Sequence, residues 1–153
     1  PFTNLVDRDA NGNVIGLASD FNMVDTIVQA EFDTGREEYP FRLLAEYLRN
    51  TRAASSQDTG IWFEARYGGS RAVDTYTLGY TYGRMQQEAS LSPFVFSDML
   101  GTNVQLHMVN LAYNPLPNLS LDLTLHFFKR LEVETGMRNN WLARPHIAAI
   151  IRF

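Results

Sequence analysis

The chain has no cysteine among its 153 residues. This absence excludes disulfide frameworks, thiol catalysis, cysteine-ligated zinc sites and c-type haem attachment. No apolar run reaches about 18 residues, which excludes a transmembrane helix. Basic residues are too few for a nucleic-acid-binding face, because 13 lysines and arginines stand against 17 acidic residues and the net charge is −4. The sequence begins at Pro1 without a basic-then-apolar leader, so we expect a processed chain or a piece of a longer one.

The sequence shows instead a period-two alternation of apolar and polar residues from Phe21 onward. Alternation of this length is typical of β-strands whose two faces meet different surroundings. It predicts seven strands, at 21–33, 40–50, 60–68, 73–84, 103–114, 118–130 and 144–153. These ranges cover about half of the chain, against roughly 20–25% strand in an average soluble domain, so the sequence predicts an all-β protein. Residues 1–20 have no sustained period and are predicted to be a loop.

Strand length and connection pattern favour an antiparallel transmembrane β-barrel. The predicted strands have about 9–13 residues, and about 9–11 are needed to cross a bilayer. Every second connection is short, as in outer-membrane barrels that alternate short periplasmic turns with long extracellular loops. The alternative is a soluble β-sandwich.

Aromatic residues concentrate near the ends of the predicted strands, where a barrel would meet the boundary between lipid and water. Those assigned to the periplasmic rim are Phe32, Phe41, Tyr67, Tyr113 and Phe153, and those assigned to the opposite rim are Tyr47, Tyr82 and Phe127. In a soluble sandwich the same aromatics would fill the core.

Several segments carry a family resemblance. They are Ser19-Asp20-Phe21 with 30–32, Ala45-Glu46-Tyr47 leading to Asn50-Thr51, 78–83 with 96–98 and 101–103, and 118–121. In this order they resemble the late strands of a family of large bacterial outer-membrane porins, over roughly 19–153. The resemblance implies an outer-membrane location in a Gram-negative-type bacterium, with lipid and small hydrophilic solutes as partners. Family members are normally longer, so this chain is expected to be the C-terminal part of a barrel, with 1–20 an extracellular loop segment.

The end of the chain resembles the general outer-membrane assembly signal. That signal is a terminal aromatic preceded by alternate apolar residues, here Ile147, Ala149, Ile151 and Phe153. The resemblance implies that the barrel-assembly machinery reads these residues.

The number of strands points to a missing part of the sheet. Single-chain bacterial barrels have even strand numbers from eight upward, and unpaired edges are not tolerated in lipid. Either further strands come from sequence outside this chain, or the count is one short and the chain forms a small eight-stranded barrel. Residues 14–17 are too few to cross a membrane.

The polar faces of the predicted strands define the expected lumen. Nine side chains are expected to line it: Asp25, Glu31, Arg42, Glu46, Glu64, Arg66, Asp122, His126 and Arg152. This predicts a porin that lets small hydrophilic solutes or ions diffuse through a water-filled lumen. The alternative is a non-conducting barrel that serves as a scaffold or as a sheath for a partner such as a cytochrome. The segment 85–102 either folds into the pore or covers its mouth, and both readings allow a homo-oligomer.

Two other patterns are weighed for chemistry. Asp7, Asp9, Asn11 and Asn13 alternate as in the front of a calcium loop, with Gly12 at the sixth position. The twelfth position lacks the bidentate Glu, so an ordinary polar turn is the alternative.

Histidine is the other candidate for chemistry. The three histidines are His107, His126 and His146, and the last two are expected to pair with Asp122 or water. No metal-ligand spacing or Gly-x-Ser-x-Gly motif is present, so the sequence predicts no enzyme. A small barrel that hydrolyses lipids is the remaining functional class.

Overall fold

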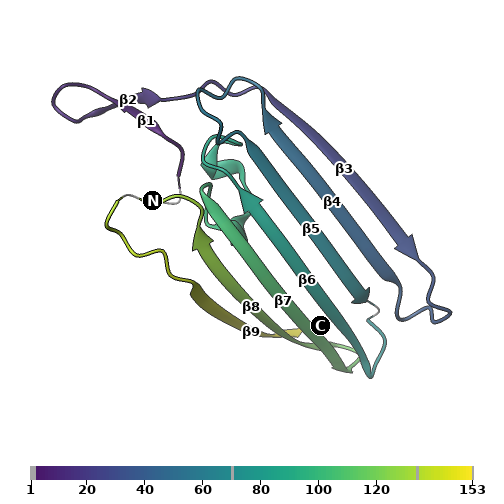
Figure 1. Ribbon diagram of the computed structural model, residues 1–153. Helices are drawn as coiled ribbons and strands as arrows, with labels where there is room; N and C mark the ends of the chain where they lie inside the picture. The colour runs from purple at the N-terminus through teal and green to yellow at the C-terminus, as the bar shows by residue number, and fades with distance from the viewer. Residues whose placement is uncertain (1–2, 70, 134, 153) are drawn as a thin grey trace.

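A computed structural model describes residues 3–69, 71–133 and 135–152 (Figure 1). Its main element is one antiparallel sheet in which each strand pairs with the next along the chain. The strands are β3 (Met23–Phe32), β4 (Phe41–Asn50), β5 (Thr59–Gly68), β6 (Thr75–Met85), β7 (Val104–Leu116), β8 (Leu119–Arg130) and β9 (Leu142–Ile151). The all-β prediction is confirmed, and each of the seven strands ends within two residues of its predicted bounds.

The main sheet is open. Among the described residues, β3 pairs only with β4 and β9 pairs only with β8, so the sheet is not closed into a barrel. Figure 1 shows β3 and β9 at opposite edges of a twisted sheet. This chain therefore does not form the small eight-stranded barrel that the sequence left open.

The prediction that 1–20 is entirely loop is wrong. β1 (Val6–Arg8) and β2 (Val14–Leu17) form a separate antiparallel hairpin. Strands of three and four residues are too short for a period to be recognised in the sequence. The hairpin projects beyond the main sheet, so the 14–17 segment is a strand but adds nothing to that sheet (Figure 1).

Cross-strand register sorts the side chains into two faces. Directly paired residues point to the same side of a sheet, and alternate residues along a strand share that side. One run of partners crosses the whole sheet as Glu31, Arg42, Arg66, Gly79, Asn110, Thr124 and His146. The neighbouring run on the other side is Ala30, Leu43, Ala65, Tyr80, Val109, Leu125 and Pro145. We call these sides the polar face and the apolar face.

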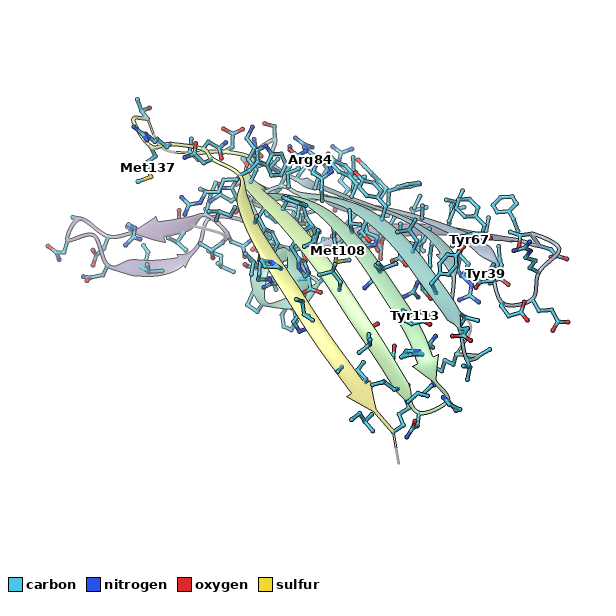
Figure 2. All side chains as sticks on the ribbon, turned by 90° about the horizontal axis from the view of Figure 1, so that it is seen from below. Tyr39, Tyr67, Arg84, Met108, Tyr113 and Met137 are labelled. Atoms are coloured by element: carbon cyan, nitrogen blue, oxygen red, sulfur yellow. The ribbon has the colours of Figure 1, made fainter. Side chains whose placement is uncertain are left out.

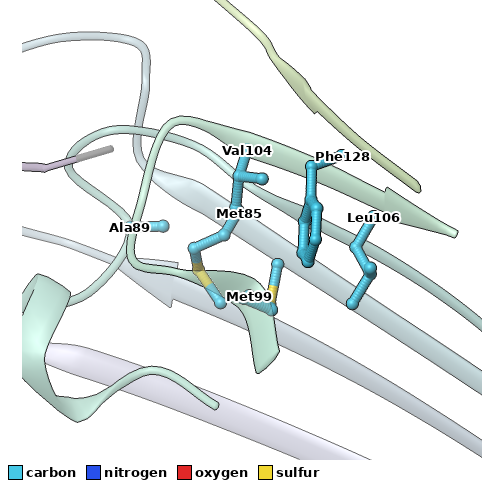
Figure 3. Packing of buried hydrophobic residues seen from close by; sticks show 6 residues of the cluster. All are labelled: Met85, Ala89, Met99, Val104, Leu106 and Phe128. Carbon is cyan, nitrogen blue, oxygen red and sulfur yellow. The ribbon is translucent and has the colours of Figure 1, made fainter. Parts of the chain in front are cut away.

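The buried core lies at one end of the polar face. The connection between β6 and β7, residues 86–103, folds back over the sheet there and contains two 3-10 turns, η1 (Ser92–Phe94) and η2 (Ser97–Met99). The buried hydrophobic residues are Met85, Ala89, Met99, Val104, Leu106 and Phe128 (Figure 3). None of the helical turns in the described part of the chain is long and apolar enough to span a membrane.

Candidate functional site

The polar face brings together all nine residues that the sequence assigned to a lumen. They fall on alternate positions of β3, β4, β5 and β8, and Arg152 follows β9 in the same alternation. The polar face is therefore the candidate functional site.

Charges on the polar face separate along the strands. Arg42 and Arg66 are direct cross-strand partners, and Arg42 also forms an ion pair with Glu31. On the same face, Glu64 belongs to the next pair toward the loop end, opposite Leu44, and Glu46 belongs to the pair after that, opposite Trp62. The two arginines therefore lie together, and the two glutamates lie nearer the loop.

The segment 86–103 docks on the polar face through an aromatic contact and a buried methionine. The rings of Phe96 and Trp62 meet edge to face with their centroids 4.9 Å apart. Met99 is 1% exposed and packs into the buried cluster. The segment therefore lies against the polar face at the loop end of the sheet.

A glycine on β6 makes this close approach feasible. A Cβ atom on Gly83 would lie 3.1 Å from Cε3 of Trp62 and 3.2 Å from Cε of Met99. Any side chain at this position would push both groups outward. Gly83 therefore helps the loop to reach the sheet.

Polar contacts join the same loop to β8 and β9. Asp98 Oδ1 accepts a hydrogen bond from Nη2 of Arg144 at 2.8 Å and lies 3.5 Å from Nε2 of His126. The Nδ1 atom of His126 lies 3.2 Å from the carbonyl oxygen of Arg144, and a carbonyl oxygen only accepts, so Nδ1 is the donor in this contact. His126 therefore faces Asp98 and not Asp122, because residues four apart on one strand are about 13 Å apart.

Two hollows lie along the polar face. The first has a volume of about 370 Å³ between the docked loop and the sheet and is lined by residues that include Glu64, Asp98, His126 and His146. The second has a volume of about 460 Å³ and extends away from the loop along the same face. The two hollows share the lining residues Arg66, Asn110, Thr124 and His146, so they adjoin one another on the polar face.

The loop end of the sheet is held by a buried asparagine. Asn50 is 1% exposed, and its side-chain amide donates to the carbonyl oxygens of Asp20 and Glu88, both at 2.9 Å. Its Oδ1 accepts the backbone N–H groups of Asn22 at 3.0 Å and Arg52 at 3.1 Å. Asn50 therefore ties three chain segments to the end of β4.

The N-terminal segment is tied to the same loop. Asn4 donates to the carbonyl oxygens of Gln87 and Ser90 at 2.7 Å each, and its Oδ1 accepts the N–H of Ser92 at 2.8 Å. The backbone N–H of Leu5 donates to Glu88 Oε1. These bonds place the β1–β2 hairpin at the loop end of the sheet.

The apolar face is larger than the apolar patches of typical soluble monomers. Ile147 is 79% exposed and Val28 is 64% exposed on this face. Seven strands at about 4.8 Å spacing, each about ten residues long at about 3.3 Å per residue, give a projected area of roughly 1,100 Å². The largest apolar patch on a typical soluble monomer is about 300–600 Å². The described part of the chain has nothing that covers this face.

Aromatic rings gather at the turn end of the apolar face. Tyr39 stacks on Tyr67 with centroids 5.4 Å apart and tilts against Tyr76 at 4.9 Å, and Phe32 lies 6.1 Å from Phe41. Figure 2 shows Tyr39 and Tyr67 together at this end, far from Arg84 at the loop end.

A second aromatic group lies at the loop end. His107 lies 5.2 Å from Tyr82 and 5.3 Å from Trp141 between ring centroids, and Lys129 sits 5.9 Å from the Trp141 ring. The two groups bracket a central zone of aliphatic residues such as Leu43 and Val109.

The calcium candidate is a closed hairpin turn. Asp9 Oδ1 accepts the backbone N–H groups of Asn11 and Asn13 at 2.9 Å each, and Oδ2 accepts the Asn13 side-chain amide at 2.9 Å. The Asn13 amide, followed by its backbone N–H, lowers the pKa of Asp9 below its ordinary range. Gly12 has a φ of +85°, a conformation that suits glycine in a tight turn. Asp7 lies in β1, and no cluster of three potential metal-ligating acidic or histidine residues occurs within the described ranges.

The residues of the expected assembly signal share one face as far as they are described. Ile147, Ala149 and Ile151 lie on the apolar face through their pairing with β8. Phe153 lies outside the described residues.

Two residues of the site were not assigned a role from the sequence. Asp98 and Trp62 act through contacts with distant segments, for which a local pattern contains no signal. Arg144 is different, because it shares the alternation of His146 on the last strand and could have been assigned to the polar face.

Comparison of the chain with family models, with curated proteins and with solved structures finds no match. The site therefore rests on the residues and geometry of this chain.

Proposed function

We propose that this chain forms the C-terminal strands of an outer-membrane β-barrel whose polar face lines a water-filled path for small hydrophilic solutes. The observation that carries the proposal is the apolar face of roughly 1,100 Å², bracketed by aromatic rings and backed by a charged face. Exposure of such an apolar face to water is unfavourable, whereas contact with lipid is not. Aromatic rings favour the lipid–water boundary.

The open edges support the same proposal. A membrane-embedded sheet must satisfy every backbone N–H and C=O group, so β3 and β9 need partners. Strands from outside this chain would pair with both edges and close the barrel. The barrel-assembly machinery would insert the product into the outer membrane of a Gram-negative-type bacterium.

The docked loop would narrow the water-filled path. Phe96 and Met99 contact the polar face near Trp62, so a solute would pass the loop through the hollow beside Asp98. Solutes that pass would meet charged groups of both signs, and rings of mixed charge select weakly among ions.

One observation favours a second function. The buried core formed by the loop occupies part of the polar face, as expected of a non-conducting barrel that acts as a scaffold or sheath for a partner protein. The two functions differ in whether ions cross.

Planar-bilayer recording on the full-length protein that contains this chain tests the proposal. We expect discrete conductance steps, and a correctly inserted protein with no steps would favour the scaffold. A protein that remains monomeric in buffer without detergent would overturn the membrane assignment altogether.

Assembly offers a separate test through Phe153. Deletion of this residue should lower the amount of folded protein in the outer membrane, whereas Phe153→Tyr keeps a terminal aromatic and should assemble. Equal amounts of folded protein for the wild type and the deletion would contradict the assembly signal.

A further inference from the structure

The hollow on the polar face away from the loop is rich in arginine. It is lined by four arginines, Arg42, Arg66, Arg71 and Arg152. Asp122 is the one acidic residue among its described lining residues. The other acidic residues of the polar face lie elsewhere: Glu64 and Asp98 line the hollow beside the loop. We call the arginine-lined hollow the basic groove.

The groove holds like charges in an unfavourable arrangement. Arg42 and Arg66 are direct cross-strand partners, so their Cβ atoms are about 4.5–5.5 Å apart, and like charges opposite one another destabilise a sheet. Glu31 offsets the charge of Arg42 alone. Within the described ranges, Arg66, Arg71 and Arg152 form no ion pair. A bound anion would remove this repulsion.

Neutral polar groups lie beside the arginines in the groove. Asn110 donates its side-chain amide to Thr124 Oγ1 at 2.9 Å, which leaves the Thr124 hydroxyl proton directed elsewhere. Gly79 lies between Arg66 and Asn110 in the row of partners, and a Cβ there would approach only Asn110, at 3.6 Å. No side chain at position 79 therefore stands between Arg66 and Asn110.

We propose that the basic groove binds a small soluble oxyanion, a solute that carries a carboxylate or phosphate group. A guanidinium group presents two parallel N–H donors that match the paired oxygens of such a group. Arg66 is the central residue, because it is the one arginine that lines both hollows and no described residue forms an ion pair with it. Passage of the anion along the polar face rests on the proposed function, whereas binding to the groove does not.

Direct binding tests the groove. Isothermal titration of the full-length protein in detergent, first with inorganic phosphate and then with succinate, should give saturable binding of at least one of them. Arg66→Gln should weaken that binding about tenfold or more, because a charge-assisted hydrogen bond is lost. Arg66→Lys, which keeps the charge without the two-pronged donor, should weaken it less.

The matched control is Arg49→Gln. Arg49 is a half-exposed arginine on the same strand as Arg42 but on the opposite face, where it pairs with Asp58. This variant loses the same charge and should bind as the wild type does. The proposal is overturned if neither anion binds, or if Arg49→Gln weakens binding as much as Arg66→Gln does.

Bilayer recordings separate failure of the groove from failure of the pore. In a conducting protein, phosphate or succinate should reduce the chloride current, and Arg66→Gln should abolish the reduction and shift the reversal potential toward cation preference. Conductance that neither anion changes would overturn the groove and leave the pore. Saturable anion binding without conductance would leave the groove and overturn the pore.

Discussion

The docked loop should be held mainly by the buried side chain of Met99 and only weakly by the ion pair of Asp98. Met99 is 1% exposed, and truncating a buried methionine to alanine costs about 2–5 kcal/mol. The Asp98 and Arg144 side chains are 37% and 45% exposed, and ion pairs at such positions contribute about 0–1 kcal/mol. The hydrophobic contact should therefore dominate the docking equilibrium.

This difference predicts distinct exchange behaviour for two variants. Met99→Ala should raise hydrogen–deuterium exchange of the 91–103 segment about 30-fold or more, since every 1.4 kcal/mol is about tenfold in a population. Asp98→Ala should raise it about fivefold at most.

Mass spectrometry of peptides from the folded protein would measure both effects, with the β4 segment as an internal reference. The reasoning would be refuted if Asp98→Ala freed the loop as much as Met99→Ala did. In a conducting barrel, Met99→Ala should also enlarge the single-channel conductance, because the loop would spend more time away from the polar face.

Three further predictions concern the apolar face, the loop end and the hairpin. Leu123→Arg on the apolar face should cost about 2–4 kcal/mol of unfolding free energy in lipid vesicles, and Thr124→Arg on the polar face should be much milder; equal urea midpoints would mean that the two faces are misassigned. Asn50→Ala removes four hydrogen bonds from a buried group and should lower the free energy of unfolding by about 2–5 kcal/mol. A urea titration measures this, and an unchanged midpoint would contradict it. Because the Asn13 amide lowers the pKa of Asp9, the hairpin gains stability that is present above the ordinary aspartate range and is lost as pH falls through the lowered pKa. Asn13→Ala should raise the pKa of Asp9 in an NMR titration. An unchanged pKa would show that the amide does not cause the shift.

The sequence alone was sufficient for the seven strands of the main sheet and their faces. Side chains alternate along any extended strand, so the spacing of residues such as Leu119, Leu121 and Leu123 identifies both the strand and the side that they share. Only Pro117 and Asn118 separate β7 from β8, so these two strands pair within a narrow choice of registers. Val109, Leu111 and Tyr113 of β7 lie on the apolar face for the same reason.

Only the tertiary structure revealed which distant residues make contact on the polar face. The docking of Met99 against Phe128 and the pairing of Asp98 with Arg144 join residues that are far apart in sequence, and no local period encodes them. The β1–β2 hairpin escaped detection because its strands are shorter than one recognisable period.

The arrangement of charge likewise required the register. Alternation places Arg42 and Arg66 on the same face, but only the pairing of β4 with β5 sets them directly opposite one another. A shift of two residues would leave both side chains on that face and bring each arginine opposite a different partner. The sequence therefore determines which residues share a face through the local geometry of the strand, whereas the distances between them depend on the tertiary structure.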